Sequence, residues 1–238
     1  MKAILLAAGL GTRLRPITDT IPKCMVNING KPLLEYWFNL LDSDQIDDIF
    51  INTHYLSHLV EEYCTSNNSA NKIRLIHEAT LLGTGGTLLR IKNLINDKPF
   101  LMAHADNLSK FDVDDFISAH HKRPSGTEIT MMTFITDDPS SCGILQLNEK
   151  GVATEMFEKI DNAPGNIANA AVYIMQPSVL AFLKSLNKEY IDFSTDVLPF
   201  FMGKINTYLN DSYHRDIGTP KSLELACRDM KSISDSSQ

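Results

Sequence analysis

Two glycines and three cations follow the first apolar run of the chain, and their types are those of a site for phosphate groups. The run covers residues 3–7, and the residues after it are Gly9, Gly11, Arg13, Arg15 and Lys23. Glycines let backbone N–H groups approach a ligand oxygen closely, and the cations add positive charge at the same place. Because position 14 is Leu14, the GxGxxG spacing of dinucleotide sites is absent, and no GK[ST] follows as in a P-loop. A strand and loop with solvated cations is the alternative interpretation of these residues alone.

Two aspartates are candidate metal ligands. Asp106 follows a predicted strand, and a carboxylate at a strand end beside a phosphate loop is well placed to hold Mg²⁺. Asp216 stands just before a predicted helix, where simple helix electrostatics would also explain it. The alternative for Asp106 is a surface aspartate in a turn. Brought together by a sheet, the two would form a reasonable magnesium site.

A glycine-rich turn at residues 82–86 is a candidate site for a flat group. The turn opens a predicted helix and can pass close to a base or ribose, and Glu78 is near enough to reach the edge of a base. Without further support, an ordinary turn at the start of a helix is the alternative. His54 and His58 are spaced i, i+4 but lack the glutamate of HExxH and a third ligand, so a zinc site is not expected.

Strands and helices alternate in the first half of the chain. Apolar runs predict strands at 2–7, 46–52, 72–77 and 99–103, and helical spacing predicts helices at 32–41, 56–63 and 87–94. Asp112 is predicted to cap a helix that runs to His121, with Asp115 as its capping-box partner. This alternation indicates an α/β fold with a doubly wound, mostly parallel, Rossmann-like sheet. Ligands bind at the carboxyl ends of the strands in such sheets, so the glycine loop, the glycine turn and Asp106 are expected along one edge.

The pattern changes after residue 126. Closely spaced strands are predicted at 128–135, 143–147, 152–157 and 170–175. They predict a mixed or antiparallel extension that lays a second face over the cleft, and Thr219-Pro220 then starts a final helix. We expect a single domain over 1–230, in two parts that meet near residue 125, and a polar, frayed tail over 231–238.

The composition excludes several classes of protein. Of the 238 residues, 43% are hydrophobic and 21% charged, which is ordinary for a folded α/β domain. The formal net charge of −7 argues against a nucleic-acid partner, which normally requires a basic stripe. No apolar run approaches the ~20 residues of a membrane span, and the start of the chain lacks the pattern of a signal peptide. The four cysteines are far apart and form no CxxC pair, so we expect reduced thiols in a cytoplasmic protein without a membrane partner.

The glycine loop resembles a known family signature. Residues 9–16 have the sequence GLGTRLRP and are followed by Pro22-Lys23, which is similar to the GxGTRLxP signature of the sugar-1-phosphate nucleotidyltransferases. Further matches follow in the family's order down to residue 220 and are most similar to bacterial mannose-1-phosphate guanylyltransferases, including those for heptose 1-phosphates. The chain departs from the family pattern at Ala105, Ile160 and His214, where a glycine, a proline and an aromatic residue are common.

The resemblance implies the roles of the site residues. Residues 1–125 would bind the nucleotide and 126–230 the sugar. The catalytic residues would be Arg13 and Lys23, and the Mg²⁺ ligands Asp106 and Asp216. The nucleotide-binding residues would be Ala8, Gly9, Gly11, Thr12, Arg13, Glu78, Gly83 and Thr84. The residues that bind the sugar phosphate would be Gly143, Glu158, Lys159 and Asn169.

The resemblance also implies the reaction: Mg²⁺-dependent transfer of a nucleotidyl group from a nucleoside triphosphate to a sugar 1-phosphate. The family recognises its base from the position of Glu78, and a carboxylate only accepts hydrogen bonds. Guanine offers N1–H and N2–H as a pair of donors and uracil only N3–H, so GTP is expected. The sugar would be mannose 1-phosphate or a related hexose or heptose 1-phosphate.

Two alternatives remain at this stage. One is a uridylyltransferase or cytidylyltransferase of the same family. The other is a non-catalytic, ligand-sensing relative, whose expected mark would be loss of Arg13, Lys23 or one aspartate, and all four are present. The apolar residues Phe200, Phe201 and Met202 are expected to be exposed and to mark an interface between copies of the chain.

Overall fold

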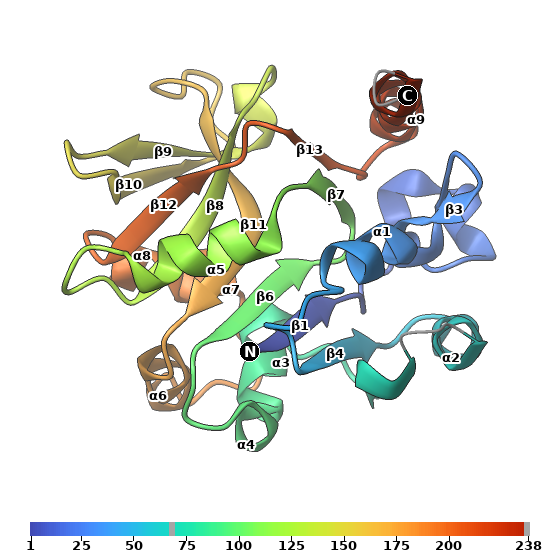
Figure 1. Ribbon diagram of the computed structural model, residues 1–238, viewed down its shortest axis with the longest axis horizontal. Helices are drawn as coiled ribbons and strands as arrows, with labels where there is room; N and C mark the ends of the chain where they lie inside the picture. Colours follow the sequence, from blue (N-terminus) through green and yellow to red (C-terminus); the bar gives the residue numbers. More distant parts are fainter. Residues whose placement is uncertain (67–69, 236–238) are drawn as a thin grey trace.

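One large mixed sheet runs through the computed structural model, which describes residues 1–66 and 70–235 (Figure 1). Its strands are β1 (Lys2–Leu6), β4 (Asp48–Thr53), β5 (Ile73–His77), β6 (Phe100–His104), β8 (Ile129–Ile135), β9 (Gly143–Leu147), β10 (Val152–Glu158), β11 (Ile167–Met175) and β12 (Ile205–Leu209). Their order in the sheet is β5-β4-β1-β6-β11-β8-β12-β10-β9. Two short ribbons join β2 (Asn27–Ile28) to β3 (Lys31–Pro32) and β7 (Asn107–Lys110) to β13 (Tyr213–Asp216).

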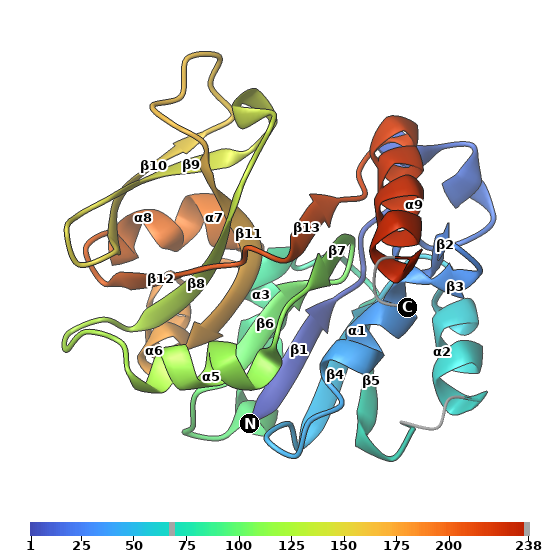
Figure 2. The ribbon, with the colours of Figure 1, turned by 45° about the horizontal axis from the view of Figure 1, so that its top comes forward.

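The direction of pairing divides the sheet into two parts. The strands β5, β4, β1 and β6 pair in parallel, which confirms the Rossmann-like part of the predicted α/β fold. Beyond β6 the pairings are antiparallel, except that β12 runs parallel to β8. The mixed extension is therefore present, but it does not form a separate second face over the cleft. Because β11 hydrogen-bonds to β6, the extension continues the same sheet at its edge (Figure 2).

Helices cover both faces of the sheet. They are α1 (Leu33–Leu40), α2 (Ser57–Ser66), α3 (Gly83–Arg90), α4 (Lys92–Ile95), α5 (Val113–His121), α6 (Ser178–Ser185), α7 (Phe193–Asp196), α8 (Leu198–Phe201) and α9 (Pro220–Asp235). Alternate residues of a strand point to opposite faces, so Ala3 and Leu5 pack with α1, α2 and α5, and Ile4 packs with α3 and α6. A strand buried on both faces is mostly apolar, and β1 is apolar after its first residue, Lys2.

A third apolar cluster holds α9 against the loops at the carboxyl end of the sheet. Leu14, Ile28, Ile217 and Ala226 are fully buried in it. Figure 2 shows α9 beside β2 and β3. Since Leu14 follows Arg13 and Ile217 follows Asp216, this cluster anchors two of the predicted site residues through their neighbours.

Several helix predictions need adjustment. The helix predicted from residue 87 begins at Gly83, so the glycine turn forms its first turn. Helix α9 continues to Asp235, further than the polar composition from Lys231 indicated, and residues 236–238 lie outside the described residues. Asp112 caps α5 as predicted, because its Oδ1 accepts the N–H groups of Asp114 and Asp115.

The apolar stretch at α8 is only partly exposed. Phe200 is 65% exposed and Phe201 is buried in the core, although both rings contact Phe182. In the described part of the chain, no helix combines the length and the apolar composition that a membrane crossing requires.

Candidate functional site

The glycine loop leaves the end of β1 and presents Arg13 to solvent. Gly11 has φ of +64°, and a Cβ there would lie 2.9 Å from Cγ2 of Thr18, so this position requires glycine. The Thr18 hydroxyl donates to the Gly11 carbonyl at 2.7 Å and closes the loop. Leu14 is fully buried next to it, whereas the side chain of Arg13 is 66% exposed. The loop is thus held by buried contacts and carries the exposed guanidinium of Arg13 on its outer side.

Asp106 and Asp216 are brought together by backbone pairing. In the β7–β13 ribbon Asp216 is opposite Asn107, and the N–H of Ile217 donates to the carbonyl of Asp106 at 3.1 Å. The indole N–H of Trp37 donates to the carbonyl of Asn107 at 2.8 Å, which fixes the turn after β6. Two carboxylates that are far apart in sequence therefore share one edge of the sheet.

Lys23 lies between the two carboxylates. Its Nζ is 2.5 Å from Oδ2 of Asp106 and 3.3 Å from Oδ1 of Asp216, and the residue is only 7% exposed. Burial by itself raises the pKa of Asp106, but the Lys23 ammonium, helped by His104, holds that pKa below its usual range. The guanidinium of Arg13 lies 3.7 Å from the other oxygen of Asp216. We call Arg13, Lys23, Asp106 and Asp216 the charged cluster.

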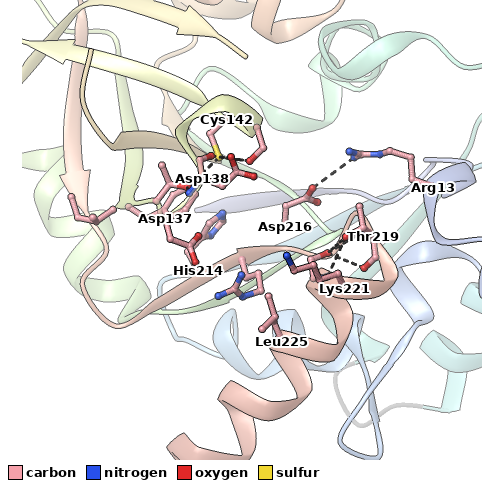
Figure 3. Close-up of a pocket in the computed structure, with 15 residues that line it drawn as sticks. Arg13, Asp137, Asp138, Cys142, His214, Asp216, Thr219, Lys221 and Leu225 are labelled. Carbon is pink, nitrogen blue, oxygen red and sulfur yellow. Dashed lines mark hydrogen bonds and ion pairs between the residues drawn. The ribbon is translucent and has the colours of Figure 1, made fainter. Parts of the chain in front are cut away.

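A cavity of about 650 Å³ opens beside the charged cluster. One wall is the start of α9 with Thr219 and Lys221, and the other is the connection between β8 and β9 with Asp138 and Cys142 (Figure 3). Asp216 and Arg13 lie at one end of the cavity, where the figure marks their ion pair. Of the charged cluster, Arg13 and Asp216 line the cavity and are accessible to a molecule bound there.

The four residues predicted to bind a sugar phosphate are grouped where β9, β10 and β11 meet. Gly143 is opposite Glu158 in the β9–β10 pair, and a Cβ at Gly143 would lie 2.7 Å from Oε2 of Glu158. Lys159 pairs with Glu158 at 3.4 Å, and its N–H donates to the carbonyl of Cys142, a residue of the cavity wall. Asn169 uses its amide within the fold, since Nδ2 donates to the Tyr173 hydroxyl at 2.8 Å and Oδ1 accepts the N–H of Ala171.

Glu78 lies just after β5 and is buried, with 1% of its surface exposed. Its Oε1 accepts hydrogen bonds from the Thr87 hydroxyl at 2.6 Å and from Nδ2 of Asn52 at 3.3 Å. The fold therefore already uses Oε1, and the expectation that this carboxylate accepts a pair of donors from guanine stays a prediction. Asn52 and Thr87 were not predicted as site residues. The only signals were a polar residue that ends an apolar strand and a hydroxyl directly after the glycine-rich turn.

The glycine turn packs against a segment that the sequence did not connect with it. Gly83 has φ of +76°, and a Cβ there would lie 2.4 Å from the carbonyl oxygen of Ile191. The N–H of Gly85 donates to the same oxygen at 2.9 Å, and the Thr84 hydroxyl accepts the N–H of Phe193 at 2.7 Å. The Thr84 side chain is thus engaged with the start of α7.

The chain matches one family model over nearly all of its length. The model for nucleotidyl transferases covers residues 2–232. Among curated proteins, the mannose-1-phosphate guanylyltransferase catalytic subunit beta of Danio rerio is 29% identical over 228 residues, which are 93% of this chain and 62% of the relative. A UTP–glucose-1-phosphate uridylyltransferase of Synechocystis is 30% identical over 213 residues, which are 84% of this chain and 54% of that relative. The chain therefore spans only about three fifths of the length of the first and about half of the second.

The fold also matches solved structures. HddC from Yersinia pseudotuberculosis superposes with a TM-score of 0.79 at 26% sequence identity, and the match covers 96% of this chain and 99% of HddC. HddC has also been solved in complex with GMP-PN, and that structure superposes with a TM-score of 0.78. The similarity thus includes both the parallel part of the sheet and its mixed extension.

Proposed function

The chain belongs to the nucleotidyl transferase family, and on that premise we propose that it transfers a nucleotidyl group from a nucleoside triphosphate to a sugar 1-phosphate. The observation that carries this proposal is the charged cluster beside the cavity, in which three ion pairs connect two cations and two carboxylates. Such a cluster suits a reaction between phosphate groups, whose negative charges must be neutralised when they approach each other.

In the proposed reaction an oxygen of the sugar phosphate attacks the α-phosphorus of the triphosphate. A phosphorus–oxygen bond forms there, the bond to the β-phosphate oxygen breaks, and pyrophosphate leaves. No covalent nucleophile from the protein is required, so catalysis consists of positioning and charge neutralisation. Arg13, which is exposed on the glycine loop, would stabilise the departing pyrophosphate, and Lys23 and Lys159 would hold the attacking phosphate.

The two aspartates fit a magnesium ion. Asp106 and Asp216 each direct one oxygen at a single point, where Nζ of Lys23 lies, so a cation there is compatible with both carboxylates. The described residues contain no group of three or more candidate ligands, and Mg²⁺ commonly uses one or two carboxylates together with substrate phosphates and water. When bound, the ion would neutralise charge on the phosphates.

We propose GTP as the nucleotide and mannose 1-phosphate, or a related hexose or heptose 1-phosphate, as the sugar. The name of the Danio rerio relative supports both the guanine nucleotide and mannose 1-phosphate. HddC has been solved with GMP-PN, whose name includes a guanine nucleotide. The Synechocystis relative uses UTP and glucose 1-phosphate according to its name, so uridylyl transfer is the competing activity. The carboxylate of Glu78 is compatible with both bases, because each offers a ring N–H to an acceptor.

A panel of reactions tests the proposal. Purified protein with Mg²⁺ is mixed with each of the four nucleoside triphosphates and with mannose, glucose or heptose 1-phosphate, and pyrophosphate release is followed. We expect the highest rate with GTP and mannose or heptose 1-phosphate. A preference for UTP and glucose 1-phosphate would replace the guanylyl assignment by the uridylyl one. No release with any pair, from folded protein, would contradict nucleotidyl transfer itself.

A further inference from the structure

A chain of buried hydrogen bonds connects the glycine loop to Glu78. The N–H of Ala7, two residues before Gly9, donates to Oδ1 of Asn52 at 2.7 Å, which leaves Nδ2 of Asn52 to face Thr87 and Glu78. Nδ2 donates to the Thr87 hydroxyl at 3.1 Å, and that hydroxyl donates to Oε1 of Glu78 at 2.6 Å. Asn52, Thr87 and Glu78 are all buried, so these bonds are not exchanged with water.

The network treats the two oxygens of Glu78 differently. Oε1 accepts from both Thr87 and Asn52, two donors for an oxygen with two lone pairs. Oε2 makes no hydrogen bond with any of the residues that the structure describes. The carboxylate is therefore held in one orientation and offers a single oxygen to a ligand.

We propose that Asn52 and Thr87 are positioning residues that make Glu78 select nucleobases with a ring N–H donor. The inference rests on the proposed function, in which Glu78 lies at the nucleobase. With Oε1 held by the protein, Oε2 accepts one N–H from the ring of the base. Thr87 contributes the shortest bond to the network and fixes the direction in which Oε2 points.

The chemistry of the four bases makes the selection specific. Guanine has a hydrogen on N1 and uracil on N3, and either one donates to Oε2. Adenine N1 and cytosine N3 carry lone pairs in the corresponding positions, so they repel the carboxylate and leave it unpaired. GTP and UTP are therefore accepted, and ATP and CTP are rejected. The second donor of guanine, N2–H, does not find the second oxygen of Glu78, so this carboxylate separates GTP from UTP only weakly.

Equilibrium binding of GTP, UTP, ATP and CTP, measured by calorimetry without a sugar phosphate, tests this inference without turnover. In the wild type we expect GTP and UTP to bind about 10- to 100-fold more tightly than ATP and CTP, the range for one hydrogen bond to a charged group. Thr87→Val keeps the shape but removes the donor, and should reduce the preference to about threefold or less. Thr87→Ser retains the hydroxyl and should restore it. Thr130→Val, which removes a buried hydroxyl on β8 that bonds to His120, is the control and should leave the preference unchanged.

The outcomes are distinct. A Thr87→Val protein that folds and retains the wild-type preference would overturn the inference, as would a wild type that binds ATP as tightly as GTP and UTP. If Thr87→Val does not fold, Thr87→Ala provides the same comparison with less bulk. Wild-type selectivity for GTP and UTP that is lost in Thr87→Val, but without pyrophosphate release from any pair of substrates, would support the inference and contradict the proposed function.

Discussion

Single residues of the charged cluster differ in exposure, and this difference separates their effects on activity and on folding. Arg13 is mostly exposed and pairs with Asp216 at 3.7 Å, whereas Lys23 is buried and bridges both aspartates. Exposed ion pairs contribute little to stability, so we expect a change at Arg13 to leave the fold intact and, under the proposed function, to act on bound phosphates. A change at Lys23 removes the cation between the carboxylates of Asp106 and Asp216, so we expect it to affect both activity and folding.

Arg13→Ala is expected to lower kcat by about 10²–10³, the range for removing one preorganised group that stabilises developing charge. The melting temperature should stay close to that of the wild type. Arg15→Ala is the matched control, because Arg15 lies two residues further along the same loop and pairs with Asp19. The comparison is made by steady-state kinetics of the two variants. If Arg13→Ala were as active as Arg15→Ala, Arg13 would have no specific role in the reaction.

Asp106→Asn and Asp216→Asn are each expected to raise the Mg²⁺ concentration needed for half-maximal rate and to lower turnover. Because both carboxylates act through one ion in this account, the turnover of the double variant should be only slightly lower than that of the less active single variant. A Mg²⁺ titration of all four proteins measures this coupling. Losses that simply multiply, or a wild type that remains active in EDTA, would exclude a shared ion.

At the scale of elements, the first turn of α3 depends on its close approach to the segment before α7. Gly83→Ala would place a methyl group 2.4 Å from the carbonyl oxygen of Ile191, in addition to the cost of a positive φ. We expect a loss of about 2–5 kcal/mol in the free energy of unfolding, from left-handed backbone and overpacking together. Gly126→Ala has a similar φ of +86° with no atom within 4 Å of the added methyl, and should lose only about 1–2 kcal/mol. Equal losses in urea unfolding would show that the contact with Ile191 is unimportant.

The last turn of α5 contains a buried histidine that makes stability depend on pH. His120 lies between Thr130 and Gln176, and burial, with Arg123 and His121, lowers its pKa to about 3. The unfolded chain takes up a proton at this residue below about pH 6.5, whereas the folded chain does not until much lower pH. Stability from this residue is therefore complete above about pH 6.5 and is lost as the pH falls toward 3.

His120→Gln should flatten the decline of the melting temperature between about pH 6.5 and 4, since the uptake of one proton on unfolding is removed. Some decline will remain, because burial lowers the pKa of His214 to about 3 as well. His121→Gln, at the neighbouring position of the same helix, is the control and should retain the wild-type slope. A wild-type slope in His120→Gln would show that its proton is not linked to folding.

For the whole molecule, the sequence is sufficient to predict the parallel part of the sheet, but not how the mixed extension joins it. Strands buried on both faces, such as β1 and β6, are apolar except for one terminal residue, and their alternation with helices indicates the parallel part. That the extension continues this sheet depends on the pairing of β11 with β6, a contact between distant segments that no local pattern encodes.

In the candidate site, too, some features could be predicted from the sequence and others could not. The glycine loop and the two aspartates have residue types and positions that indicate phosphate and metal chemistry. Two features are set by tertiary contacts and were not predictable: the capture of Oε1 of Glu78 by Asn52 and Thr87, and the contact of Gly83 with Ile191. The position of Lys23 between the aspartates likewise depends on the β7–β13 ribbon, which brings residue 216 to residue 106.

Identification of the product tests the central claim most directly. Wild-type protein is incubated with GTP, mannose 1-phosphate and Mg²⁺, the products are separated and identified by mass spectrometry, and the Asp106→Asn, Asp216→Asn double variant is treated in parallel. The account predicts a GDP-sugar and pyrophosphate in equal amounts from the wild type, and a strongly reduced yield from the double variant. The absence of any nucleotide sugar with all four nucleoside triphosphates, or its formation by the double variant at the wild-type rate, would contradict the claim that this cluster catalyses nucleotidyl transfer.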